Sequence, residues 1–144
     1  MSRAFVIDAS VAIAWIHPAQ ATEQTRAMLE AVADGAVIEV PALWPIEVAN
    51  ALLVLERRRK LNAAERGRAL EWLPRLPLKV DHEMALLAFG PVSELAAEFS
   101  LSVYDAVYLE LAMRRRLPLA CKDGALLDGA RRARAAIWRA PESR

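Results

Sequence analysis

The sequence contains very little cysteine and histidine. Its single cysteine, Cys121, cannot form an internal disulfide bond, and no signal-peptide pattern precedes the strand-like run that begins at Ala4. We therefore expect a reducing, cytoplasmic setting. The two histidines, His17 and His82, lie outside any recognisable motif with a serine or a cysteine. Their positions argue against a side-chain nucleophile activated by histidine.

Long apolar runs and a strong net charge are also missing. The apolar stretches are too short or too interrupted to cross a bilayer, which takes about 20 residues, so we expect no membrane contact. A net charge of +1 selects no class of partner. The hydrophobic fraction of 56% excludes a disordered chain, and a length of 144 residues matches one domain. We expect a single globular domain over residues 1–144.

Positive charge is nevertheless concentrated locally. Residues 110–144 contain nine basic residues against four acidic ones, and a second basic cluster occupies residues 57–60. Either cluster could hold a phosphate backbone, although a solvated helix end is the simpler explanation of each.

Hydrophobic periodicity and the positions of proline and glycine predict the order of the elements. We expect strands at residues 4–7, 37–40, 78–80, 118–121 and 136–138. The predicted helices cover residues 11–16, 21–33, 41–55, 63–73, 83–99 with an interruption at Gly90-Pro91, 103–115 and 124–132. Strands that alternate with helices indicate an α/β fold with a mainly parallel central sheet flanked by helices.

Four acidic residues stand in apolar surroundings. Glu47 is the only charged residue in the stretch 41–55, and Asn50 is its polar neighbour on the same helix face. Asp8 follows the apolar run 5–7, Asp105 lies on a stripe that should face the core, and Asp123 follows the run 117–121. Burying a lone carboxylate is costly unless a partner or a metal ion compensates it. We interpret the four acids as one metal site at the carboxyl edge of the sheet.

Each acid also has a local structural alternative. Asp8 and Asp123 could each cap a helix, Asp105 could complete a capping box begun by Ser102, and Glu47 could offset the positive end of its own helix. The convergence of all four favours a metal, because clustered carboxylates raise one another's pKa unless a cation neutralises them.

Four short motifs follow one another along the chain: Asp8-Ala9-Ser10, Glu47-Val48-Ala49-Asn50, Ser102-Val103-Tyr104-Asp105-Ala106 and Cys121-Lys122-Asp123. In this order they resemble the PIN domain over essentially the whole chain, and in particular the toxin ribonuclease of VapBC toxin–antitoxin pairs. The resemblance implies a Mg²⁺- or Mn²⁺-dependent endoribonuclease that cleaves RNA with a metal-activated water. The implied metal ligands are Asp8, Glu47, Asp105 and Asp123, with Ser10 and Asn50 as polar support.

The resemblance also implies partners. We expect an RNA substrate, a cognate antitoxin protein and a two-fold homodimer, with an antitoxin groove walled by the helices around Trp15, Ala27 and Trp44. The four tryptophans are expected in the core or at an interface rather than as stacking platforms for bases.

Two rival functions remain. A phosphoryl-transfer enzyme with Asp8 as nucleophile would also collect acids at strand ends, but Ser10 stands where such an enzyme has a second aspartate. A catalytically silent PIN-like binding module would keep the fold, and the four intact acids argue against it.

Overall fold

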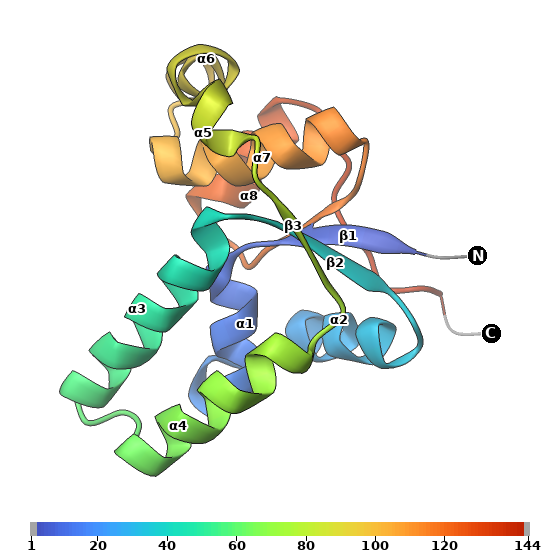
Figure 1. Ribbon diagram of the computed structural model, residues 1–144. Coiled ribbons are helices and arrows are strands. Elements are labelled where there is room, and N and C mark those ends of the chain that lie inside the picture. Colours follow the sequence, from blue (N-terminus) through green and yellow to red (C-terminus); the bar gives the residue numbers. More distant parts are fainter. Residues whose placement is uncertain (1–2, 143–144) are drawn as a thin grey trace.

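Four parallel strands form the centre of the fold in the computed structural model, which describes residues 3–142 (Figure 1). The order across the sheet is β3-β2-β1-β4, and the strands are β1 (Ala4–Ile7), β2 (Val37–Pro41), β3 (Leu78–Asp81) and β4 (Leu119–Ala120). β1 and β2 are nearly continuous apolar runs, as strands buried on both faces of a parallel sheet require. The predicted α/β class with a parallel central sheet is confirmed.

Strand register determines what lies at the carboxyl edge of the sheet. Ile7 of β1 pairs with Ala120 of β4, and Pro41 of β2 pairs with Asp81 of β3. Asp8 therefore stands one residue beyond the end of β1, at the edge where parallel strands deliver ligand-binding groups.

The strand expected at residues 136–138 is reduced to a single bridge between Leu119 and Ile137. Two backbone hydrogen bonds hold it, from Leu119 N to Ala136 O and from Trp138 N to Leu119 O, each 2.9 Å long. β4 is correspondingly short, because only Leu119 and Ala120 pair with β1.

Helices occupy most of the remaining chain. They are α1 (Ala9–Ile16), α2 (Glu23–Ala33), α3 (Leu43–Arg57), α4 (Ala63–Trp72), α5 (Met84–Leu87), α6 (Ser93–Glu98), α7 (Val103–Arg115) and α8 (Ala125–Arg132). Short 3₁₀ turns follow α1 and α4 at Pro18–Gln20 and Leu73–Arg75, and a π-type turn joins α5 to α6 at Ala88–Val92.

Local chemistry sets most helix ends. Complete capping boxes begin α2 at Thr22 and Thr25 and α4 at Asn62 and Glu65, which moves the start of α2 two residues later than predicted. The predicted break at Gly90-Pro91 is confirmed, since Gly90 has a non-helical conformation between α5 and α6.

The helices cover both faces of the sheet. α7 packs against β1 and β2 with α6 and α8 nearby, while α1 and α2 lie on the opposite face (Figure 1). α3 packs against α1 and α4, and the α3–α4 pair extends away from the sheet. Among residues 3–142, no single helix is both long and apolar enough to span a membrane. The α5–α6 segment and α7 reach that length and apolar composition only when taken together, and a bend of 102° separates them.

α3 is less buried than its composition predicts. Pro41 belongs to β2 rather than to the helix, and within α3 only Trp44, Val48 and Leu52 are fully buried. Ile46 is 69% exposed. The apolar sequence of α3 therefore supplies one face to the core and leaves another face in solvent.

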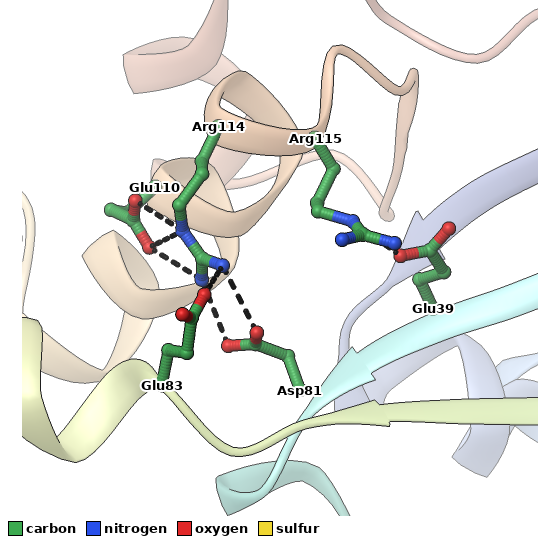
Figure 2. A network of polar contacts seen from close by, with 6 residues as sticks. All are labelled: Glu39, Asp81, Glu83, Glu110, Arg114 and Arg115. Carbon is green, nitrogen blue, oxygen red and sulfur yellow. Dashed lines mark hydrogen bonds and ion pairs between the residues drawn. The ribbon is translucent and has the colours of Figure 1, made fainter.

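An ion-pair network fastens the end of α7 to the sheet (Figure 2). Arg114 contacts Asp81 at 2.8 Å, Glu83 at 2.6 Å and Glu110 at 2.9 Å. Arg115 contacts Glu39 of β2 at 3.0 Å. We call these six residues the α7 clasp. Arg114 and Arg115 are two of the basic residues that the sequence suggested for phosphate binding, and the clasp pairs both with acids.

The Trp44 side chain is only 2% exposed and packs inside the core, so it cannot itself line the predicted antitoxin groove. The groove between the helices around Trp15, Ala27 and Trp44 stays a prediction. Trp15 is half-buried, and its indole Nε1 donates to Thr25 O at 2.7 Å. Its ring meets Trp72 edge to face at 6.4 Å. These tryptophans serve packing, as expected from sequence.

Candidate active site

Asp8 occupies the junction between β1 and α1. It is the N-cap of α1 in extended conformation, and its Oδ1 accepts hydrogen bonds from Ser10 Oγ at 2.7 Å and from Val11 N at 3.3 Å. Trp44 Nε1 donates to the backbone oxygen of Asp8 at 3.3 Å. The structural alternative for Asp8, a helix cap, is thus realised through one carboxylate oxygen.

Burial gives Asp8 an unusual acidity. Desolvation raises the pKa of the Asp8 carboxyl to about 6, the hydrogen bonds from Ser10 and Val11 oppose this rise, and the charges of Asp105 and Glu47 add to it. Such a carboxyl group is still mostly ionised at physiological pH, so its buried negative charge would be stabilised by a nearby cation. Ser10 thus contacts the Asp8 carboxylate directly, and its role as polar support of a metal site stays a prediction.

Glu47 stands in the second turn of α3, where it is half-buried. Tyr108 OH, from the buried face of α7, donates to Glu47 Oε1 at 2.5 Å. Burial raises the pKa of Glu47, the Tyr108 hydrogen bond opposes the rise, and the charge of Asp105 adds to it. Since Glu47 lies beyond the first turn of α3, the alternative role of offsetting that helix end does not describe it.

Asp105 belongs to the first turn of α7. Its backbone N–H donates to Ser102 Oγ at 3.0 Å, so Ser102 caps the helix as the sequence suggests. Burial raises the pKa of the Asp105 carboxyl, while interaction with the Ser102 side chain opposes the rise. The charge of Asp105 adds to the rise that burial causes in the pKa values of Asp8 and Glu47, so these three carboxylates lie within electrostatic reach of one another.

Asp123 lies to one side of this group. It is exposed, and the N-cap of α8 is Gly124 at φ 154°, so the predicted capping role of Asp123 is not realised. Burial raises the pKa of the Cys121 thiol, and the charges of Asp8, Asp105 and Asp123 add to the rise, so Cys121 lies near all three acids. Asn50 is exposed on α3, three residues from Glu47.

The donor set suits a hard cation. Asp8, Glu47 and Asp105 offer carboxylate oxygens, the ligands that Mg²⁺ and Mn²⁺ prefer. Within residues 3–142, no group of three or more His, Cys, Asp or Glu side chains is placed so that together they could hold a metal ion. Mg²⁺ does not need such a group, because it keeps several waters and uses one or two protein carboxylates. The residues present therefore fit such an ion.

Sequence reasoning missed Tyr108. Its position three residues after Asp105 puts both side chains on one face of α7, and that spacing is the signal that could have found it. Apolar side chains flank the acids on the outside: Ile46 just before Glu47 is 69% exposed, and Val103 and Tyr104 just before Asp105 are 46% and 64% exposed.

One known protein family matches most of the chain. The family model described as PIN domain matches residues 5–131. A search of curated proteins gave no significant sequence match.

Solved structures resemble the whole chain. PAE2754 from Pyrobaculum aerophilum is 23% identical with a TM-score of 0.64, covering 90% of this chain and 87% of that one. VapBC2 from Rickettsia felis, bound to a DNA fragment from its promoter, is 12% identical with a TM-score of 0.65 and coverage of 93% and 96%. FitAcB from Neisseria gonorrhoeae is 17% identical with a TM-score of 0.59 and coverage of 96% and 97%. At these identities the likeness concerns the fold.

Proposed function

The chain belongs to the PIN-domain family, and from this premise we propose that it is a Mg²⁺- or Mn²⁺-dependent endoribonuclease acting as the toxin of a type II toxin–antitoxin pair. One observation carries the proposal: Asp8, Glu47 and Asp105, from three separate elements, share a partly buried position where burial raises each pKa. Structural likeness to VapBC2 and FitAcB supports the toxin assignment.

Each residue has a task in this proposal. Asp8, Glu47 and Asp105 would hold the cation, and Asp123, two residues beyond Cys121, would complete the set. When bound, the cation supplies an acidified water and neutralises charge on the departing oxygen. Ser10 fixes the Asp8 carboxylate, Tyr108 fixes the Glu47 carboxylate, and Asn50 offers a polar group next to Glu47.

The proposed partners follow from the same family. We propose a cognate antitoxin and a two-fold homodimer in the cytoplasm, with no membrane association. Fully exposed Phe89 and 86% exposed Leu86, beside the break between α5 and α6, supply apolar surface that a second protein can cover.

The reaction is tested with purified protein free of its partner and a single-stranded RNA whose bases and backbone are accessible. Cleavage should require Mg²⁺ or Mn²⁺ and stop with EDTA. The variants Asp8→Asn, Glu47→Gln and Asp105→Asn should each cleave roughly 10²-fold more slowly, by analogy with the loss of one preorganised electrostatic group. Rates are measured from single-turnover time courses.

Asp34→Asn is the matched control, because Asp34 is an exposed acid at the end of α2. Its rate should equal that of the unmodified protein. Full activity in EDTA, or full activity in all three site variants, would refute the metal-nuclease proposal. A covalent phosphate trapped on Asp8 would instead support the rival phosphoryl-transfer enzyme.

A further inference from the structure

A cleft of about 910 Å³ opens beside β4, and its lining residues include Thr25 of α2 together with Asp123, Arg131 and Trp138. Cys121 and Lys122 form the part of its wall nearest the sheet, and Arg139 forms the part nearest the end of the described chain. Asp8, Glu47 and Asp105 are not among its lining residues. The cleft is therefore distinct from the three-carboxylate group.

The cleft is nevertheless continuous with the carboxylates. Ile7 of β1 pairs with Ala120 of β4 in parallel register. The residues that follow them, Asp8 and Cys121, therefore leave neighbouring strands side by side. Since Cys121 lines the cleft, the cleft directly adjoins the candidate active site.

The charge of the cleft is positive. Lys122, Arg131 and Arg139 line it against the single acid Asp123. Lys122 is fixed in the wall, because its Nζ donates to Gln20 O at 2.8 Å. Among residues 3–142, Arg131 and Arg139 are exposed and form no side-chain hydrogen bond or ion pair, whereas Arg114 and Arg115 are held in the α7 clasp. The two guanidinium groups are thus able to bind an anion.

Trp138 adds an aromatic wall. Its backbone N–H bonds to Leu119 O at 2.9 Å, and its ring packs on Phe5 with centroids 5.6 Å apart at 44°. These contacts hold a half-buried indole at the cleft. Proteins that bind single-stranded nucleic acid combine this pair of features, cations that follow the backbone and aromatic rings on which bases stack.

We propose that this cleft binds the nucleotides of the RNA next to the scissile phosphate, through phosphate contacts with Arg131 and Arg139 and through stacking of a base on Trp138. The inference rests on the proposed ribonuclease function and specifies its substrate-binding surface. It also changes the expected role of Trp138, which the sequence alone assigned to packing.

Binding is measured by fluorescence anisotropy of a labelled single-stranded RNA, with every variant made in the Asp8→Asn background to prevent cleavage. Arg131→Ala with Arg139→Ala should weaken binding about tenfold and reduce the salt slope of log K by about 1.4, at roughly 0.7 for each phosphate that is no longer neutralised. Trp138→Leu should weaken binding about fivefold or more while leaving the salt slope unchanged.

The matched control removes the same charge elsewhere. Arg57→Ala with Arg58→Ala neutralises the other basic cluster, at the end of α3, and should change affinity less than twofold. Thermal melting checks that each variant is folded. If the alanine pair fails to fold, Arg131→Gln with Arg139→Gln replaces it, and Trp138→Tyr should restore the affinity lost in Trp138→Leu.

Cleavage by the protein with Asp8 intact is measured separately, so that the two proposals can fail independently. If the protein cleaves RNA but the double variant at Arg131 and Arg139 loses no more affinity than the one at Arg57 and Arg58, the cleft proposal is overturned and the ribonuclease proposal stands. RNA binding that depends on Arg131 and Arg139 without any cleavage supports the cleft and overturns the ribonuclease. Absence of RNA binding overturns the cleft proposal, whereas the ribonuclease proposal is decided by the cleavage measurement alone. The remaining outcome is an acidic-peptide site. In that case polyglutamate binds with the same dependence on the two arginines, and Trp138→Leu leaves the affinity for RNA unchanged. This result overturns the cleft proposal.

Discussion

The buried Asp8 carboxylate lowers the free energy of unfolding of the metal-free protein. Burial raises the pKa of this carboxyl from 3.8 to about 6 in the folded state, so the folded protein holds the proton more tightly than the unfolded chain does. Stability from that proton is fully present below pH 3.8 and is lost as pH rises to about 6. Above that range the shift corresponds to roughly 3 kcal/mol of lost stability.

Asp8→Asn should therefore stabilise the metal-free protein at pH 7, by up to roughly 3 kcal/mol, and confer no advantage at pH 3.5. Asparagine keeps the cap of α1. Urea unfolding in EDTA across this pH range measures the difference, and saturating Mn²⁺ should reverse it by stabilising only the unmodified protein. A pH-independent difference would contradict this account of Asp8, and Asp34→Asn provides the reference for an exposed aspartate.

Tyr108 should moderate the rise that burial causes in the pKa of Glu47, because its hydrogen bond stabilises the ionised carboxylate. Tyr108→Phe should therefore raise the pKa of Glu47 and shift the acid limb of the pH profile of kcat/KM to higher pH, because Glu47 must be ionised to act. Tyr104→Phe changes an exposed tyrosine and should leave the profile in place. Coincident profiles for Tyr108→Phe and the unmodified protein would remove Tyr108 from the site.

The candidate site was only partly accessible from sequence. Asp8, Glu47 and Asp105 were identifiable because a carboxylate in an apolar pattern implies compensation. The charge of Asp105 adds to the rise that burial causes in the pKa values of the other two, while the role of the three as metal ligands stays a prediction. Asp123 was grouped with them by order along the chain, and its exposure could not be read from that order. Tyr108 was missed because a tyrosine in a buried helix face is usually core.

Among the elements, α7 depends most on charge. The side chains of Glu110 and Asp81 are only 8% and 13% exposed, and Arg114 lies between them. Arg114→Ala leaves both acids without their partner. The cost should be roughly 2 kcal/mol or more, between the values for surface and for buried ion pairs.

Urea unfolding at pH 7 measures this cost, and Arg66→Ala is the control, since the Arg66–Glu56 pair is about one-third exposed and should contribute less than about 1 kcal/mol. Arg114 lowers the pKa of Asp81 chiefly through their hydrogen bond, so the clasp stabilises above pH 3.8 and its contribution falls as pH drops further. An Arg114→Ala cost that is as large at pH 2.5 as at pH 7 would contradict an ionic clasp.

Elements with a local signal were predictable. Capping residues, the Gly90-Pro91 break and the buried runs of β1 and β2 all produced the expected elements within a few residues. The strand expected at 136–138 became one bridge because its length depends on the neighbour it pairs with, and β4 offers only Leu119. The open face of α3 was likewise invisible, since composition does not say which helix covers which.

At the scale of the whole molecule, self-association should depend on the α5–α6 region. Leu86 is 86% exposed and Phe89 is fully exposed, which is unusual for large apolar side chains in a monomer. Light scattering at micromolar concentration should show a dimer, and Phe89→Glu with Leu86→Glu should give a monomer. Leu70→Glu, at a 38% exposed position on α4, is the control and should remain dimeric. A monomeric unmodified protein, or a dimer unaffected by the double change, would contradict this assignment.

The two edges of the sheet give this chain different aggregation hazards. At one edge β4 is only two residues long and is covered by the bridge to Ile137, so it offers little backbone to another chain. At the other edge β3 has one side unpaired within the sheet. Lys79 is exposed in the middle of β3, and Pro77 directly precedes the strand. Both features make that edge a poor template for fibril growth, and an incoming strand would have to bury the lysine charge. Acetylation of Lys79 would remove this charge and leave Pro77 alone to protect the β3 edge, so the modified chain should be more prone to pair with another strand there.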